Sequence, residues 1–128
     1  MKRTLLISII GFIILIVISI FLQYYLEKSS DKLLIELNNL RVLVNENKIY
    51  ESVMINEKLN QKWEETKSKW SALIDHQELD NIEEVMHRIE ILIGEDEEKA
   101  ELLSELNKLK FYFEHVPVRE KFAIENIL

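Results

Sequence analysis

The apolar residues of this chain first form one nearly continuous run and then adopt a helical period. The run extends from Leu5 to Leu22 and is broken only by Ser8, Gly11 and Ser19. As a helix it would be about 27 Å long, close to the hydrocarbon thickness of a bilayer. Tyr24 and Tyr25 follow, and aromatic rings with a polar tip suit the headgroup layer. The pattern predicts a transmembrane helix over residues 5–25.

A cleavable signal peptide is the alternative interpretation, because it also places basic residues before an apolar stretch. Its apolar region is usually shorter and is followed by small residues, whereas this run ends in Phe21, Leu22 and Gln23. The sequence therefore favours an uncleaved signal anchor. Lys2 and Arg3 precede the run, and the charges after it cancel, so the positive-inside rule places residues 1–4 in the cytoplasm. Residues 26–128 are then extracytoplasmic, on the outer side of the cell membrane.

Beyond the run, apolar residues recur at intervals of three and four, which predicts four helices. The first helix continues from the membrane segment to a turn at residues 45–48. The second is predicted over residues 49–74, and two overlapping capping boxes, Asp75 with Glu78 and Asp80 with Glu83, open the third. Gly94 ends the third helix. The predicted packing faces are, in order, Leu26, Leu33, Leu37, Leu40 and Val44; Ile49, Val53, Trp63, Trp70 and Ile74; Leu79, Ile82, Val85, Met86, Ile89, Leu92 and Ile93; and Leu102, Leu106, Leu109, Phe113 and Val116.

The end of the chain has a different pattern. Pro117 is predicted to stop the fourth helix, and Val118, Phe122, Ile124 and Leu128 then fall on even positions. This alternation predicts an extended tail over residues 117–128, laid along the bundle or offered to a partner. The expected fold is all-α, with an N-terminal transmembrane helix, a small antiparallel bundle of about four helices and this C-terminal tail.

Composition narrows the function classes. The chain has two Gly, one Pro and no Cys, which suits helices and excludes disulfides, thiolate metal sites and a Cys nucleophile. Without Lys2 and Arg3, 14 basic residues face 23 acidic ones, a net charge of about −9. This charge argues against nucleic acid as a partner. Acidic residues concentrate between Asp75 and Glu105, so one part of the surface is expected to be strongly negative.

The residues that could carry chemistry are few. Glu84 and His87 form a Glu-x-x-His pair, which di-iron bundles use twice, but the chain has no second copy. His76 is a helix-junction residue or a pH-sensing group, and His115 is a partner of helix-end carbonyls or a ligand. The acidic run Glu95–Glu98 suits a helix start and lacks the spacing of a calcium loop. We therefore expect no enzyme activity, no cofactor and no metal.

Trp63 and Trp70 lie seven residues apart on one helix face. Core packing is the favoured interpretation, because a small bundle without disulfides needs large buried side chains. An exposed aromatic platform for a ligand is the alternative.

Several of these residues also carry a family resemblance. Trp70, His76 and Glu78 with the Leu-rich segment Glu101–Leu109, then His115 and the ending Asn126-Ile127-Leu128, are similar to an uncharacterised bacterial family, domain of unknown function 4363. The resemblance implies a short membrane-anchored protein with a helical external domain, in company with a polytopic membrane protein, and it assigns no reaction. The candidate interaction residues are Trp70, His76, Glu78, His115, Phe122 and Asn126.

Three functions are compatible with these features. The leading hypothesis is a non-enzymatic single-pass membrane protein that contacts the lipid bilayer through residues 5–25 and binds an integral membrane partner through its external domain. The alternative is a sensory, ligand-binding four-helix domain that acts through a partner. A division-type coiled-coil protein is disfavoured, since Gly94, Pro117 and the turn near Asn45 fold the chain back.

Overall fold

The computed structural model describes residues 1–127, without the side chains of Asp96, Ile124 and Ile127. Four helices, α1 (Lys2–Asn45), α2 (Ile49–Trp70), α3 (His76–Leu92) and α4 (Lys99–Ile127), are joined by short turns, with a 3₁₀ turn η1 (Asp96–Glu98) before α4. No strand occurs among the described residues. The predicted all-α class is confirmed.

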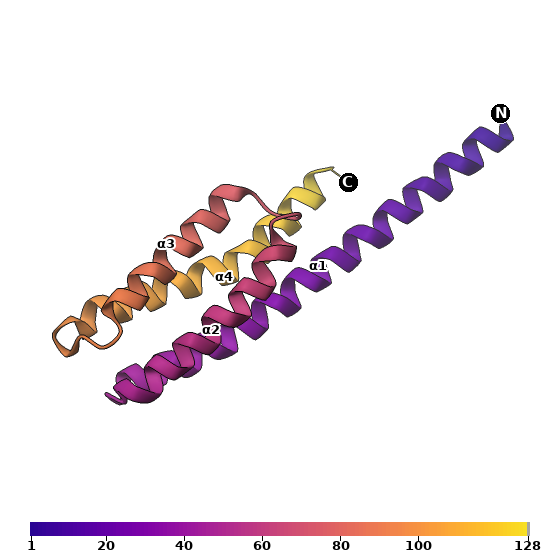
Figure 1. Ribbon diagram of the computed structural model, residues 1–128. Helices are drawn as coiled ribbons and strands as arrows, with labels where there is room; N and C mark the ends of the chain where they lie inside the picture. The colour runs from indigo at the N-terminus through magenta and orange to yellow at the C-terminus, as the bar shows by residue number, and fades with distance from the viewer. Residues whose placement is uncertain (128) are drawn as a thin grey trace.

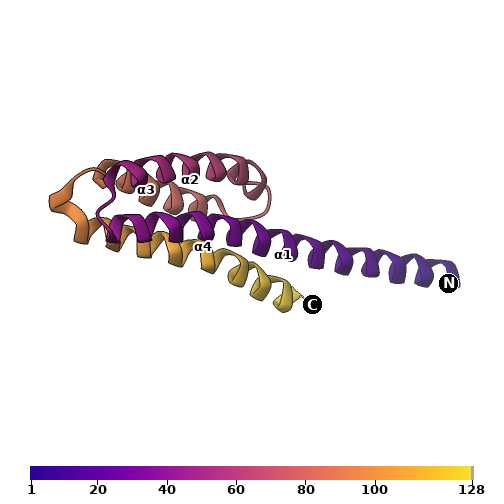
Figure 2. The ribbon, with the colours of Figure 1, turned by 90° about the horizontal axis from the view of Figure 1, so that it is seen from below.

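The helices form an antiparallel bundle, and α1 is much longer than its neighbours (Figure 1). Its 44 residues would extend over about 66 Å. The C-terminal half of α1 packs against α2 and α4, α3 packs against α4, and α2 and α3 approach each other less closely. The N-terminal half projects beyond the bundle in both views (Figures 1 and 2). The end of α4 lies beside α1 and diverges from it toward the C-terminus (Figure 2).

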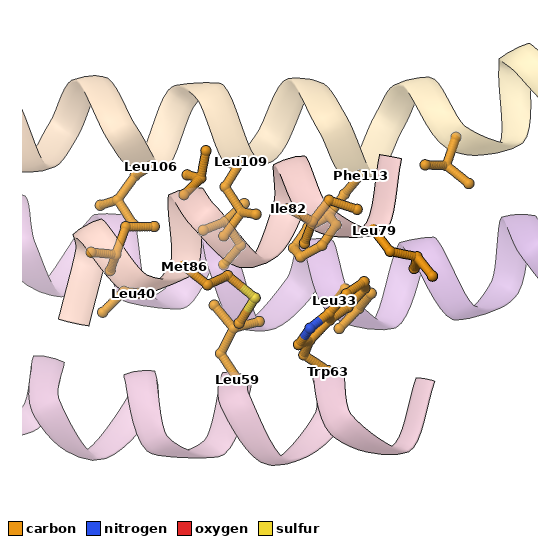
Figure 3. Packing of buried hydrophobic residues seen from close by; sticks show 14 of the residues in the cluster. Leu33, Leu40, Leu59, Trp63, Leu79, Ile82, Met86, Leu106, Leu109 and Phe113 are labelled. Atoms are coloured by element: carbon orange, nitrogen blue, oxygen red, sulfur yellow. The ribbon is translucent and has the colours of Figure 1, made fainter. Parts of the chain in front are cut away.

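The core lies where the predicted apolar faces of the four helices meet. Side chains from all four point into one centre, among them Leu33, Leu59, Ile82 and Phe113 (Figure 3). The faces predicted for the bundle part of α1 and for α4 are buried at every position, and the α3 face is buried except for the half-buried Leu92. Spacing alone was sufficient for these helices, because each buries one continuous stripe.

α2 differs from its predicted face. Trp63, Trp70 and Ile74 are buried, but Ile49 and Val53 are 39% and 37% exposed. The α2 positions that are buried nearest to them are polar, Ser52 and Asn56. The helix also ends at Trp70, four residues before the predicted boundary, and residues 71–74 form a turn. The prediction was wrong here because the inward face of α2 begins with polar residues that hydropathy assigns to the surface.

The turns follow the predicted chemistry in part. Asn47 has a φ of 59° and Gly94 a φ of 142°, the left-handed region that Asn and Gly tolerate. Asp75 caps α3 by accepting a hydrogen bond from the Gln77 backbone N–H at 3.2 Å. The reciprocal half of the predicted capping box is not formed, because the Glu78 carboxylate accepts a hydrogen bond from Arg119 on α4 instead.

The predicted extended tail is wrong, since α4 continues as a helix through Pro117 to Ile127. Proline has no N–H, so the Phe113 carbonyl one turn earlier loses its helical donor. The Ser30 hydroxyl of α1 donates to that carbonyl at 2.5 Å. The Gln23 side-chain amide of α1 donates to the Pro117 carbonyl at 2.8 Å. α1 thus supplies the polar partner that a proline-containing helix lacks. The predicted alternation included the side chains of Ile124 and Leu128, which lie outside the described residues.

Candidate functional site

Three polar residues of α1 connect it to the end of α2 and to the middle of α4. Gln23 and Ser30 bond to α4 as described above, and the Ser29 hydroxyl accepts a hydrogen bond from the Trp70 indole N–H at 2.8 Å. We call Gln23, Ser29 and Ser30 with these partners the junction. It lies directly after the apolar run of α1, so the run and the bundle are joined without a flexible link.

The apolar run itself is exposed. α1 contains a segment that is long and apolar enough to cross a membrane, and none of this segment is buried. Its large side chains include Leu5, Phe12, Leu15 and Phe21, each more than half exposed. A soluble core helix would bury such residues, so this half of α1 needs a cover that the described part of the chain does not supply.

Trp70 and Trp63 are core residues, as favoured from the sequence. Trp70 is fully buried and Trp63 is 2% exposed, and their rings meet edge to face at 5.7 Å. The Trp63 indole N–H points to Glu83 of α3 at 3.4 Å. The side chain of Trp70, a candidate interaction residue, is thus inaccessible from the surface and takes part in the junction.

Glu78 and His115, predicted separately, line one groove between α3 and α4 with Phe111 and Arg119. Arg119 donates to Glu78 at 2.7 Å, and Glu78 is only 9% exposed. The other Glu78 oxygen is buried and has no hydrogen-bond partner among the described residues. His115 is exposed and stacks on the Phe111 ring at 5.3 Å and 13°. The stacked Phe111 ring and His115 imidazole both lie on the outer rim of the groove.

Charged groups lie at two further helix contacts. Glu36 of α1 is 4% exposed and accepts bonds from Lys62 and Lys58 of α2 at 2.8 and 3.3 Å. The hydrogen bond from Lys62 lowers the pKa of Glu36, more than burial raises it, and Lys58 adds to the lowering. Lys67 of α2 pairs with Glu83 of α3. These carboxylates link helices and have the partners expected of buried charge.

Near the end of α4 a third carboxylate behaves differently. Burial raises the pKa of Glu120, and the neighbouring charges of Glu78 and Asp75 raise it further, against the opposing effect of Arg119. The end of the α3–α4 pair that lies nearer the apolar run of α1 therefore gathers acidic side chains around the cation of Arg119.

The other titratable candidates are dispersed. His76 is exposed at the start of α3. Glu84 and His87 are exposed farther along the helix, where Glu84 pairs with Arg88 at 3.1 Å and His87 faces the side of α2. Among residues 1–127, excluding side chains not described, no three His, Asp or Glu side chains gather as metal ligands would. Nothing in this arrangement provides a nucleophile next to a base.

An exposed stripe runs down the outer face of α4. Phe111, His115, Val118 and Phe122 follow spacings of 4, 3 and 4, and the three apolar members are 57%, 48% and 61% exposed. We call these four residues the α4 ridge. Asn126 continues the stripe by one turn and is also exposed. The ridge brings together two sequence candidates, His115 and Phe122, in a helix where the sequence had predicted a break.

Sequence reasoning missed Gln23, Ser29, Ser30 and Arg119. Serines and a glutamine directly after an apolar run look like the polar flank of a membrane helix. The helical spacing of Ser29 and Ser30 could have indicated their role, because residues 26, 29, 30 and 33 share the buried face of one helix. The partners of Gln23 and Ser30 lie 94 and 83 residues away in the chain, so only the three-dimensional structure reveals them.

Comparison with known proteins relates the chain to an uncharacterised family. The family model described as domain of unknown function (DUF4363) matches residues 20–127. No curated protein and no solved structure is significantly similar to the chain.

Proposed function

We propose that this chain, which belongs to the DUF4363 family, is a non-enzymatic, single-pass membrane protein whose external helical domain binds an integral membrane protein. Residues 5–25 would span the cell membrane, with residues 1–4 in the cytoplasm and the bundle outside. Phe111, His115 and Val118 of the α4 ridge would be the contact surface. The proposal assigns no catalytic residue and no cofactor.

The α4 ridge is the observation that carries this proposal. A short bundle that exposes Phe111, Val118 and Phe122 in one stripe has an apolar surface it does not cover itself. Aromatic and apolar side chains in one row are typical of helix-packing interfaces. The ridge runs toward the apolar run of α1, because Pro117 is bonded to Gln23. A partner that covers this stripe would therefore meet it close to the bilayer, which favours a membrane protein.

The anchor has independent support. The apolar run is uncovered, it is the length of a bilayer core, and it continues into the bundle as one helix. The junction fixes how the bundle sits on that helix. A partner bound at the ridge would thus be oriented relative to the membrane as well as to the domain.

Site-specific photo-crosslinking tests the proposal. A photoreactive amino acid is placed at Phe111 or at Val118 of the full-length protein in cells, and membranes are extracted in mild detergent. We expect one discrete membrane-protein adduct from both positions. The matched control is Tyr50 on α2, which is aromatic and 77% exposed and lies at the end of the bundle opposite Val118, near the start of α4.

Two results would contradict the proposal. The first is no adduct from Phe111 and Val118. The second is the same adducts from Tyr50, because this would mean unselective collision. A Phe111→Asp variant tests binding directly. It should reduce the yield of the Val118 adduct at least tenfold while leaving the bundle folded.

The sensory alternative is favoured by a different observation. α2 and α3 pack less closely than the α1–α2, α1–α4 and α3–α4 pairs and leave a groove lined mostly by polar and charged side chains, including Glu64, Lys67, His87 and Glu90. A small cationic ligand would suit such a surface. Thermal stabilisation of the full-length protein by a ligand, abolished in a Glu90→Gln variant, would favour this function over the interaction module.

A further inference from the structure

The last turns of α4 lie beside the apolar run of α1. A groove between the two helices is lined by Ile16, Ile20 and Gln23 of α1 and by Lys121 and Glu125 of α4. The Gln23–Pro117 hydrogen bond sets the antiparallel register of this pair. At 1.5 Å per residue, Phe122 lies about 7 Å from Pro117 toward the N-terminus of α1. It is therefore level with Ile18, about 6 Å inside the end of the apolar run at Leu22.

We infer that the end of α4, residues 118–127, is an interfacial helix that enters the headgroup layer of the same bilayer that α1 spans, at an angle to the membrane surface. Phe122 would face the acyl chains, and the charged side chains would extend from the helix toward headgroups and water. The inference rests on the proposed function, since it requires that α1 spans the membrane. It adds a second, peripheral membrane contact to the anchor.

Position along the membrane normal supports the bilayer as the occupant. Interfacial helices bury their apolar face about 5–10 Å into the boundary between headgroups and acyl chains. The depth of Phe122 relative to the end of the apolar run falls within this range. Since α4 is bonded to α1 at Pro117, its end cannot lie far above the membrane surface.

The charges of the segment limit how deeply it enters the membrane. Arg119, Glu120, Lys121 and Glu125 lie within ten residues, and charged groups are costly in hydrocarbon. Lys and Arg can extend along an apolar surface and keep their charge in the headgroup layer. Two basic and two acidic residues cancel, so attachment does not depend on anionic lipid. The divergence of α4 from α1 (Figure 2) gives this segment access to lipid on both sides.

The apolar residues of the segment point outward, away from the bundle. Phe122 is 61% exposed and Val118 is 48% exposed, although Val116 and Pro117, directly before them, are buried. A water-facing end of a helix rarely keeps a phenyl ring this exposed without a partner. The bilayer is the one partner that α1 itself would bring to this place.

Spin-label depth measurement tests the inference, and the absence of cysteine makes single labels specific. The full-length protein carries a nitroxide at Phe122→Cys and is reconstituted alone in phosphatidylcholine vesicles. We expect collisions with oxygen to exceed collisions with a water-soluble nickel reagent. The matched control is Phe111→Cys, the same residue type on the same face of α4, about three turns farther from the membrane. There we expect the nickel reagent to dominate.

A third label, Ile14→Cys in the centre of the apolar run, separates the two proposals. If Ile14 reports hydrocarbon and Phe122 is as water-accessible as Phe111, the interfacial helix is excluded and the anchor stands. If the label at Phe122 is shielded from both reagents, a protein contact covers it and the inference is also excluded. If Ile14 itself is in water, the proposed anchor fails and the inference fails with it.

Discussion

Ser30 shows how one hydroxyl group determines the path of a helix. Its hydrogen bond to the Phe113 carbonyl replaces the donor that Pro117 cannot supply. The carbonyl is buried between α1 and α4, where an unmade hydrogen bond would carry its full desolvation cost. The residue that allows α4 to continue is thus not in α4.

A double-mutant cycle tests this role. Ser30→Ala should lower the free energy of unfolding by about 1–3 kcal/mol, because the Phe113 carbonyl loses its donor. In the Pro117→Ala background the same change should cost clearly less, because the substituted alanine restores a backbone N–H. Urea unfolding of the full-length protein in detergent, followed by the fluorescence of the buried Trp63 and Trp70, measures both. Ser68→Ala, which removes an exposed hydroxyl bonded to Glu65, is the control. Equal costs in both backgrounds would contradict the proposed role.

Glu36 gives a pH-dependent prediction. Its pKa in the folded state is lowered from 4.5 by hydrogen bonds from Lys62 and Lys58. A lowered pKa stabilises the folded state at pH values above the unfolded pKa, and this contribution is lost as the pH falls through the folded pKa. Glu36→Gln should therefore be less stable than the natural chain near neutral pH, and the difference should shrink below about pH 4.5.

The same unfolding measurement from about pH 7 to about pH 3 checks this prediction. Glu46→Gln is the matched control, since Glu46 pairs with Lys48 at 3.1 Å on the surface, half exposed. Its effect should be small at every pH. A Glu36→Gln difference that is constant with pH would indicate that packing, and not charge, is lost.

The contacts between elements explain which predictions were correct. The packing faces of α1, α3 and α4 follow from periodicity because each consists of large apolar side chains at regular intervals. The turns at Asn47 and Gly94 follow from residue type, since few residues adopt a positive φ.

The errors have one cause, polar side chains that act over long distances in the chain. Local rules predict that Pro117 breaks the helix. The helix continues because Ser30 and Gln23 of α1 donate hydrogen bonds to the Phe113 and Pro117 carbonyls. The spacing of Glu78 predicts a capping box, but the Glu78 carboxylate instead accepts a hydrogen bond from Arg119 across the α3–α4 contact. Of the candidate site, the sequence provided His115 and Phe122 but not the continuous ridge, because the ridge exists only if α4 is unbroken.

The α3–α4 contact provides an element-scale prediction. Arg119→Met should destabilise the protein by about 2 kcal/mol, because Glu78 is left as a buried carboxylate without its cation. Adding Glu78→Gln should recover most of this loss, since no buried charge then remains. Lys110→Met removes an exposed pair with Glu114 at 3.8 Å and should cost less than about 1 kcal/mol. Chemical unfolding of the three variants in detergent measures these free energies of unfolding. If Glu78→Gln did not recover the loss, the ion-pair explanation would be contradicted.

At the scale of the whole molecule, α1 is both the candidate anchor and the central element of the bundle. No Gly or Pro lies between Phe12 and Val44, and the junction bonds α1 to both α2 and α4 at the same level. The bundle therefore has a fixed orientation relative to the apolar run. A tilt of α1 in the membrane would move the α4 ridge with it, which suits a domain that presents one face to a neighbour in the same bilayer.

The orientation of this anchor is open to direct measurement. Lys2 and Arg3 precede the run, and the positive-inside rule then places the bundle outside the cytoplasm. In a Tyr50→Cys variant the single thiol is exposed at the far end of the bundle, and a membrane-impermeant maleimide should label it in intact cells. A Thr4→Cys variant should be labelled only after the cells are opened. The reverse pattern would place the domain in the cytoplasm, and the α4 ridge would then meet the inner face of the membrane and a different set of neighbours.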